Sequence, residues 1–312
     1  MNDSYKNYKI AKMNLVEKYS KKINRLRRIN SNLDSFITIN DFLANEQSLG
    51  PNADQGDISY EYNKIENITN YLKILVDELH FNKVVCITNY TLKYGANYIV
   101  ENAIEYNVTR DELLIPEDLV KELKKCRNKR FIYIYFGILW EQRPSGHANM
   151  IIIDTVNKTI ERYEPHGHSL IYDKKKNILK RIDSKFNSKL LNYIGLKNYT
   201  YISPVDISPK IGVQVKADAY NGMCVTYSLM YLQLRIMNPD VDQKDIVKYL
   251  LKKSRSEIYD IILRYAKYIE DKLKENSTKI IVHNDQLYTK TFQKIKKFVV
   301  INKRNEIDII IY

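Results

Sequence analysis

Three segments rich in β-branched and aromatic residues follow one another closely and most constrain the fold. They cover residues 130–139, 147–154 and 159–164. Such runs favour β-strands, and the connector TVNK between the second and third is short enough for a hairpin. In a hairpin the end of the third strand lies beside the start of the second. We therefore expect an antiparallel pair that brings His147 and Glu164 within reach of each other.

Helical patterns surround these strands, and together they predict an α+β fold with a central mixed β-sheet. Further strands are expected over 83–90, near 199–203 and in the C-terminal stretches KIIVHNDQLY and FVVINKRNEIDIIIY. Helices are expected over residues 5–30, 58–81, 92–106, from Pro116 to near Cys126, and over 172–191, 224–237, 244–253 and 257–273.

Cys224 falls at or near the first turn of one expected helix. Apolar residues recur at helical spacing from Val225 to Ile236, and Asn238-Pro239 stops the pattern. A helix N-terminus carries partial positive charge and exposed N–H groups, which favour a thiolate and can donate to an oxyanion. The setting suits a nucleophilic cysteine, although a cysteine taken alone is more often a small core residue.

The chain divides most clearly at SLGPNADQGD, residues 48–57, which is rich in turn-forming residues. We predict a basic helical extension and linker over 1–57, a catalytic domain over 58–275 and a strand-rich tail over 276–312. The basic helix of the extension fits a solvated helix on the protein body, and also a membrane-surface or partner-binding helix.

The net charge of +13 raises the question of a polyanionic partner. The composition leans on Lys, Asn, Ile and Tyr, residues served by A/T-rich codons. Genome bias is therefore favoured over a nucleic-acid-binding surface, which stays possible. The N-terminus lacks the apolar region of a secretory signal, and the longest apolar run, 131–140, is too short for a membrane span.

The three cysteines have spacings typical of neither a disulfide framework nor a zinc site. A reducing, intracellular location is expected, in the cytoplasm, a host cell or a virion. A carboxylate bound to one imidazole nitrogen fixes the tautomer and leaves the other nitrogen to act as a base. His147 and Glu164 thus form two parts of a catalytic triad that needs a nucleophile, and Cys224 is the candidate.

The order of these residues resembles that of the adenain and SUMO-protease superfamily of cysteine peptidases, including its bacterial and viral deubiquitinating relatives. The matching stretches are HANMIIID from His147, IERYEPHG around Glu164 and NGMC ending at Cys224. They span roughly residues 130–240. The resemblance implies a papain-like superfold with the cysteine at the start of a helix packed against the sheet.

By this resemblance Cys224 is the nucleophile, His147 the base and later the acid, and Glu164 the orienting carboxylate. Gln214 is the oxyanion donor, with Asp218 and Asn221 as rivals for that role. Trp140, Asn221 and Gly222 are the expected substrate-binding residues. The sequence departs from the family pattern at Ala148, where the family has tryptophan, and at Glu164, where SUMO proteases use Asp.

The resulting hypothesis is an intracellular thiol peptidase that removes or processes ubiquitin or a ubiquitin-like protein through an acyl-enzyme. Three alternatives stay open: a virion-precursor maturation protease, a YopJ-type acetyltransferase acting on Ser, Thr or Lys, and a non-enzymatic basic scaffold or nucleic-acid-binding protein. No cofactor or metal is expected, because the HGH tripeptide after Glu164 has no second ligand pair at suitable spacing.

Overall fold

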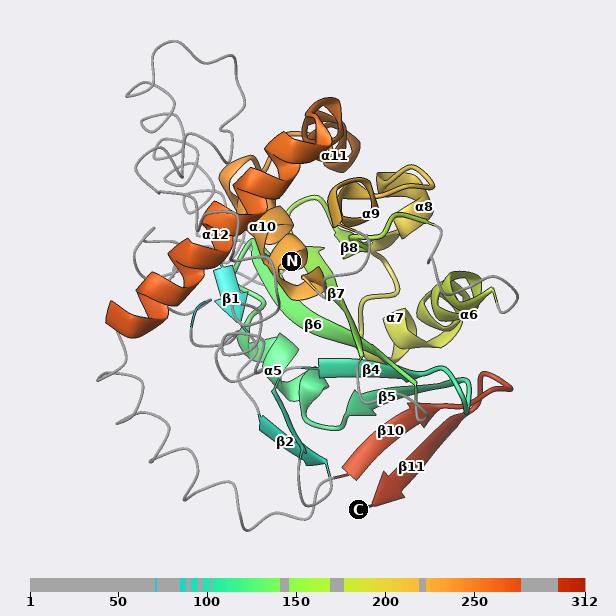
Figure 1. Ribbon diagram of the computed structural model, residues 1–312. Coiled ribbons are helices and arrows are strands. Elements are labelled where there is room, and N and C mark those ends of the chain that lie inside the picture. Colours follow the sequence, from blue (N-terminus) through green and yellow to red (C-terminus); the bar gives the residue numbers. More distant parts are fainter. Residues whose placement is uncertain are drawn as a thin grey trace.

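The computed structural model describes Tyr71 and residues 85–87, 91–94, 98–101, 103–140, 146–168, 177–218, 223–275 and 297–311. Within these residues a sheet of nine strands has the order β11-β10-β5-β4-β6-β7-β8-β9, and β1 also pairs with β6 (Figure 1). The strands are β1 (Val85–Ile87), β4 (Ala103–Asn107), β5 (Glu112–Pro116), β6 (Phe131–Leu139), β7 (His147–Asp154), β8 (Thr159–Tyr163), β9 (Thr200–Ile202), β10 (Lys297–Ile301) and β11 (Ile307–Ile311). A separate hairpin joins β2 (Thr91–Tyr94) to β3 (Tyr98–Glu101).

The sheet is mixed, as the sequence predicts. Strands β6, β7 and β8 pair antiparallel in sequence order. Strands β1 and β4 pair with β6 in parallel, and β8 pairs with β9 in parallel. Because helices accompany this sheet on both faces, the predicted α+β class is confirmed.

Two groups of helices cover the two faces of the sheet (Figure 1). One group packs on the hydrophobic cluster that contains Tyr133 and Met150, and the other on the cluster that contains Ile134 and Ile151. The first group is α8 (Pro204–Ile207), α9 (Val213–Asp218), α10 (Cys224–Met237), α11 (Gln243–Lys252) and α12 (Arg255–Glu275). The second is α5 (Leu119–Lys125), α6 (Ile178–Lys185), the π-helix η2 (Phe186–Leu190) and α7 (Leu191–Tyr193).

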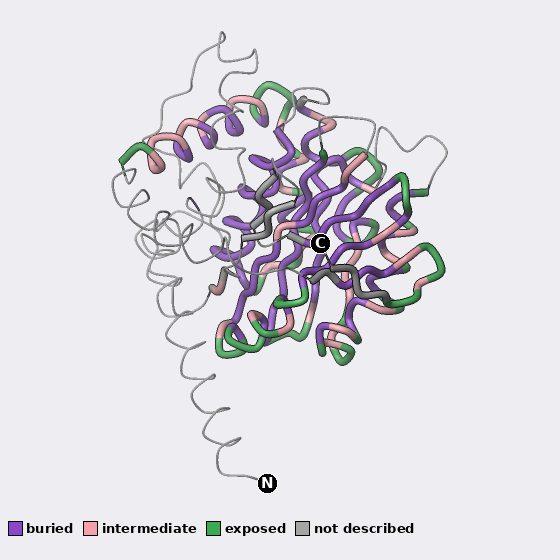
Figure 2. The backbone as a smooth tube through the Cα atoms, turned by 90° about the horizontal axis from the view of Figure 1, so that it is seen from below, coloured by how far each residue is buried: buried purple, intermediate pink, exposed green. Residues whose placement is uncertain are grey.

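Strand β6 shows why the central segments read as nearly continuous apolar runs. Its side chains alternate, so that Phe131 and Tyr133 enter one cluster while Ile132 and Ile134 enter the other. A strand buried on both faces has little use for polar residues. Helix α10 lies over β7, and every one of its residues is buried. Figure 2 shows that buried backbone, in purple, fills the interior of the described part, while exposed segments, in green, lie at its edges.

Most of the predicted elements from residue 130 to residue 275 are confirmed: the three central strands, the strand near 199–203, and the helices now labelled α10, α11 and α12. The helix expected over 172–191 begins at Ile178 within the described residues and continues as η2 and α7. Its apolar side enters the core through Ile178 and Ile182. The extension and linker over 1–57 lie outside the described residues.

Upstream of residue 130, one predicted helix is wrong, and another is present but begins later than predicted. The helix expected over 92–106 is replaced by β2, β3 and most of β4. Pro116 ends β5 instead of opening a helix, and α5 begins at Leu119. Short apolar runs rich in Tyr, Ile and Val fit either periodicity, and here pairing with neighbouring strands decides for the extended form.

The C-terminal strands join the main sheet. Strand β10 pairs antiparallel with β5 and with β11, so residues far apart in sequence extend one edge of the sheet. Local sequence pattern carries no information on this docking. The stretch KIIVHNDQLY lies outside the described residues.

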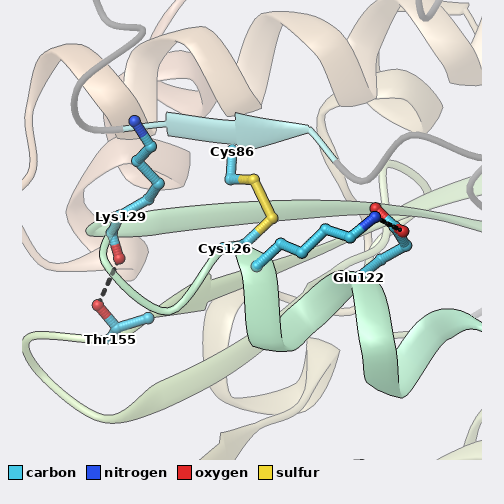
Figure 3. Close-up of a disulfide and its surroundings, with 6 residues drawn as sticks. Cys86, Glu122, Cys126, Lys129 and Thr155 are labelled. Carbon is cyan, nitrogen blue, oxygen red and sulfur yellow. Dashed lines mark hydrogen bonds and ion pairs between the residues drawn. A yellow bond between two sulfur atoms is a disulfide. The ribbon is translucent and has the colours of Figure 1, made fainter.

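Cys86 and Cys126 form a disulfide, which corrects the expectation of unpaired cysteines (Figure 3). Their Cα atoms lie 5.6 Å apart. Parallel pairing places Cys86 beside Ile132 on β6, and Cys126 caps α5 shortly before that strand begins. Their separation of 40 residues hides this proximity in the sequence. Cysteine spacing therefore no longer supports a reducing compartment, since disulfides persist mainly in oxidising ones.

Among the described residues, no helix combines the length and the apolar character that crossing a bilayer requires.

Candidate active site

His147 and Glu164 meet where β7 begins and β8 ends. The antiparallel register pairs Met150 with Tyr163, so Glu164 follows β8 directly beside the first residues of β7. The distance from His147 Nε2 to Glu164 Oε1 is 2.5 Å, and both side chains are buried. The predicted proximity of the two residues is confirmed, whereas their catalytic roles stay a prediction.

The Glu164 carboxylate is held from three sides. Beside the His147 ring, the Asn149 side-chain amide donates to Oε2 at 2.8 Å, and the backbone N–H of His166 donates to Oε1 at 2.9 Å. Arg162 fixes that amide by donating to Asn149 Oδ1 at 2.9 Å. Burial alone would raise the pKa of Glu164, but the charge and hydrogen bond of His147 outweigh it and lower that pKa to about 2. The carboxylate is therefore ionised.

Cys224 is the first residue of α10, as predicted, and it lies outside the disulfide. The backbone N–H of Ala148 donates to its Sγ at 3.4 Å. Burial opposes ionisation of the thiol, but a hydrogen bond with His147 and the charge of that ring lower the pKa of Cys224 below its ordinary value. The N-terminal end of α10 adds partial positive charge at the same place.

The His147 ring links the thiol to the carboxylate. Its Nε2 is engaged by Glu164, so the other nitrogen, Nδ1, is the one left for Cys224. Burial lowers the pKa of the ring, but the Glu164 charge and the contacts with Cys224 and Glu164 prevail and raise it to about 10. At neutral pH these shifts favour a thiolate beside an imidazolium, which is the reactive state of a cysteine nucleophile.

His166 is a further component that the sequence did not reveal. Its ring stacks on the His147 ring, with centroids 4.2 Å apart and an interplanar angle of 26°. Burial and the neighbouring His147 charge lower the pKa of His166 to about 4, so the ring is neutral where His147 is charged. Its place in the HGH tripeptide, two residues after Glu164, was the available signal.

The turn after Glu164 is tied to the segment that carries Gln214. Gly167 has φ +89°, and its backbone approaches Gly212 so closely that a Cβ on either glycine would clash with backbone atoms. The Gly212 N–H donates to His166 O at 2.8 Å, and the Gln214 N–H donates to Pro165 O at 3.0 Å. Gln214 is thereby fixed relative to the His147–Glu164 pair.

Gln214 is buried within α9, and no hydrogen bond joins its side chain to Cys224 among the described contacts. Among the residues that the structure describes, no group forms a hydrogen bond with Gln214 Oε1. The predicted oxyanion role stays a prediction. Its rival Asp218 ends α9, and its other rival, Asn221, lies outside the described residues together with Gly222.

Trp140 follows β6 and packs against the cluster that contains Ile134, on the face opposite α10. A substrate-binding role for it stays a prediction. Asp154, at the far end of β7, accepts hydrogen bonds from the Val156 and Asn157 backbone and pairs with Arg130. It belongs to a different part of the sheet from His147.

One group of ligand-type side chains coincides with the site. Nitrogen and oxygen atoms of His147, Glu164 and His166 lie within 4.8 Å of one another, and all three residues are buried. A divalent ion bound there would replace the hydrogen bond between His147 and Glu164 and remove the base from Cys224. In this structure His147 Nε2 and Glu164 Oε1 lie 2.5 Å apart, too close for an ion to lie between them.

Comparisons with known proteins are sparse. No protein-family model matches the chain. An alignment 208 positions long, which covers 59% of the chain, shows 26% identity to "Putative ankyrin repeat protein L371" of Acanthamoeba polyphaga mimivirus. The match spans 27% of that protein, so the chain corresponds to about a quarter of its length. The solved structure of the Chlamydia trachomatis effector protein ChlaDUB1 aligns over 70% of this chain and 74% of that one, with 8% identity and a TM-score of 0.35.

Proposed function

We propose that the chain is a thiol peptidase of the papain-like superfold that uses Cys224, His147 and Glu164. The observation that carries this proposal is the buried series of contacts from Glu164 through the His147 ring to a cysteine at a helix N-terminus. A structural histidine does not need a carboxylate, a thiol and a stacked aromatic ring around it. A ring that faces the thiol and a carboxylate that orients this ring are the groups that an activated cysteine requires.

The reaction follows from the positions of these groups. The Cys224 thiolate attacks the substrate carbonyl carbon, and the Ala148 N–H and the start of α10 are near enough to stabilise the developing oxyanion. The His147 imidazolium gives its proton to the leaving amine as the C–N bond breaks, which leaves a thioester on Cys224. The neutral ring then takes a proton from water, whose oxygen attacks the thioester and restores the thiolate.

The burial of the nucleophile indicates the substrate class. Cys224 is 8% exposed, so a bulky side chain next to the scissile carbonyl would collide with its surroundings. A tail of small residues in extended conformation, such as the Gly-Gly end of ubiquitin or a ubiquitin-like protein, reaches such a sulfur most easily. Processing of these modifiers is therefore part of the proposal.

The test is covalent labelling by ubiquitin and SUMO probes that bear a C-terminal electrophile. The wild-type chain should gain the mass of one probe, Cys224→Ala should gain none, and His168→Ala should label like wild type. His168 is a matched control because its ring contacts the Ser208 carbonyl outside the triad. Labelling that survives Cys224→Ala would contradict the proposal.

Failure of both probes, with rapid alkylation of Cys224 by iodoacetamide, would leave a thiol enzyme with another acyl substrate. Incubation with labelled acetyl-coenzyme A would then test the acetyltransferase alternative, and incubation with capsid-type precursor proteins would test a maturation protease. Slow alkylation, with salt-dependent binding to mixed-sequence nucleic acid, would favour the non-enzymatic alternative.

A further inference from the structure

A second acidic side chain lies on the same face of the sheet as Cys224. Glu105 on β4 pairs with Gly137 on β6, and Gly137 pairs with Ala148 on β7. Residues paired across neighbouring strands share a face, so these three stand in one row across the sheet. Ala148 belongs to the cluster under α10, and its N–H donates to Cys224 Sγ. The row therefore extends from Ala148, which contacts the proposed nucleophile Cys224, across Gly137 to Glu105.

Glu105 differs from the other buried acidic residues of the sheet. Glu161 pairs with Arg235, Asp154 with Arg130, and Glu164 with His147. Glu105 is only 9% exposed, yet within the described part of the chain no hydrogen bond or ion pair joins its carboxyl to another residue. Burial raises its pKa to about 7. A buried carboxylate without a partner is costly, and it gains most from a cation that arrives from outside.

Gly137 carries no side chain between Glu105 and Ala148, the residue that contacts Cys224. A Cβ placed on this glycine would lie 3.8 Å from Glu105 Cγ and 3.7 Å from a ring carbon of Tyr135. Those two side chains therefore flank a position that has no side chain of its own. Burial and, after it, the charges of Cys224 and Glu105 raise the pKa of Tyr135, so this ring lies near both groups. A glycine inside an apolar strand often marks the close approach of another backbone.

We propose that Glu105 is a specificity residue that binds a basic side chain, arginine or lysine, on the acyl side of the peptide substrate. This inference rests on the proposed thiol peptidase function. The substrate backbone crosses over Gly137 on its way to Cys224, and its cationic side chain pairs with the Glu105 carboxylate. The recognised tail supplies the acyl group, so the residues that cross Gly137 precede the scissile bond.

The register also places the basic residue along the substrate. Two strand spacings separate Glu105 from Ala148, which amounts to about 10 Å. An extended peptide advances roughly 3.3 Å per residue. The basic side chain is therefore expected about three residues before the scissile carbonyl, upstream of the small residues that fit beside the buried sulfur.

The experiment measures alkylation of Cys224 by tetrapeptide chloromethyl ketones ending in Gly-Gly, with Arg, Gln or Glu at the third or fourth position from the electrophile. Second-order rates are compared for wild type, Glu105→Gln and the control Glu117→Gln, with iodoacetamide as the small neutral reagent. Glu117 is exposed after β5, so its change removes the same charge elsewhere. Thermal melting confirms that each variant folds.

The Arg peptide should react roughly tenfold faster than the Gln peptide with wild type and with Glu117→Gln, the effect of one charge-assisted contact. Glu105→Gln should reduce this ratio to within about twofold while leaving the iodoacetamide rate unchanged. Equal rates for Arg and Gln peptides with wild type, or a preference that survives in Glu105→Gln, would overturn the inference. If iodoacetamide also fails to alkylate Cys224, the proposed function itself falls, and this inference falls with it.

Discussion

Strand β7 carries a buried ionic cluster at each of its ends, and the two clusters differ in the cation that they use. At the start of the strand, Glu164 pairs with His147 beside Cys224. At the other end, Asp154 and Glu161 lie near Arg130 and Arg235, which keep their charge at every accessible pH. Both clusters satisfy buried carboxylates, but only the histidine can release its proton. The proposed function assigns proton transfer to the first cluster, whereas the arginines of the second keep a fixed charge in the core.

The largest expected difference between the two clusters concerns Cys224, the proposed nucleophile. Cys224→Ala removes the attacking atom but leaves the His147–Glu164 pair and the core intact. We expect hydrolysis of a ubiquitin-tail substrate to fall by at least about a thousandfold, since loss of a triad nucleophile has effects of that order or more. Denaturant unfolding should change by less than about 1 kcal/mol. A large loss of stability would show that Cys224 serves chiefly as a core residue.

A substitution in the cluster of Asp154, Glu161, Arg130 and Arg235 should have the opposite effect, a loss of stability with little change in the reactivity of Cys224. Arg235→Met leaves Glu161 buried without its cation, and loss of one member of a buried pair costs about 3–5 kcal/mol. Urea unfolding should show this loss, while the alkylation rate of Cys224 in the folded protein stays within about twofold of wild type. The double variant Arg235→Met with Glu161→Gln should recover part of the stability. An alkylation rate that collapses in folded Arg235→Met would contradict the separation of the two clusters.

The pH dependence of activity tests whether Glu164 sets the pKa of His147. Activity should rise with pH as Cys224, whose pKa is lowered by His147, becomes a thiolate. It should fall again as the His147 imidazolium loses its proton through its raised pKa of about 10. Glu164→Gln removes the charge that chiefly raises the His147 pKa, so the alkaline limb should move to lower pH and narrow the profile. The measurement is kcat/KM between pH 5 and 11, and an unmoved alkaline limb would exclude Glu164 as the partner that sets it.

Stability should also titrate through this pair. Glu164 has its pKa lowered to about 2 in the folded chain, so its stabilisation is complete above the ordinary carboxyl pKa and is lost as pH falls towards 2. His147 has a raised pKa, so its stabilisation is complete below the ordinary imidazole pKa and is lost as pH rises towards 10. The free energy of unfolding of wild type should decline at both limits, and Glu164→Gln should flatten both declines. Equal slopes of the unfolding free energy against pH in wild type and Glu164→Gln would contradict the coupling of stability to the His147–Glu164 pair.

The sequence predicts the contact between His147 and Glu164 well because the pattern at that end of β7 is local. Alternation within 147–154 and 159–164, with a short connector, sets the pairing that brings His147 to Glu164. Helical spacing after Cys224 sets the start of α10. His166 was visible only as part of a tripeptide, because stacking on His147 depends on the turn at Gly167 and on its contact with Gly212.

Residues whose surroundings come from distant segments were not predictable in this way. Glu105 was assigned to a helix, and its burial on the active-site face follows from the pairing of β4 with β6. The disulfide joins two cysteines whose proximity depends on the pairing of β1 with the same strand. Gly137, a glycine inside an apolar strand, is a local pattern that agrees with the proposed passage of a substrate backbone over this part of the sheet.

The smallest expected effect concerns the ring that stacks on His147. His166→Ala removes a neutral aromatic surface whose centroid lies 4.2 Å from that of the His147 ring, while the backbone N–H of residue 166 still donates to Glu164. The His147 ring then gains freedom to turn away from Cys224, and kcat should fall roughly fivefold with little change in KM, as expected for a group that orients a base. His166→Phe keeps the stacking and should retain most of the activity and an unchanged pH profile. An equal loss in both variants would instead indicate that the ring nitrogens matter, since phenylalanine replaces the surface but not the polar atoms.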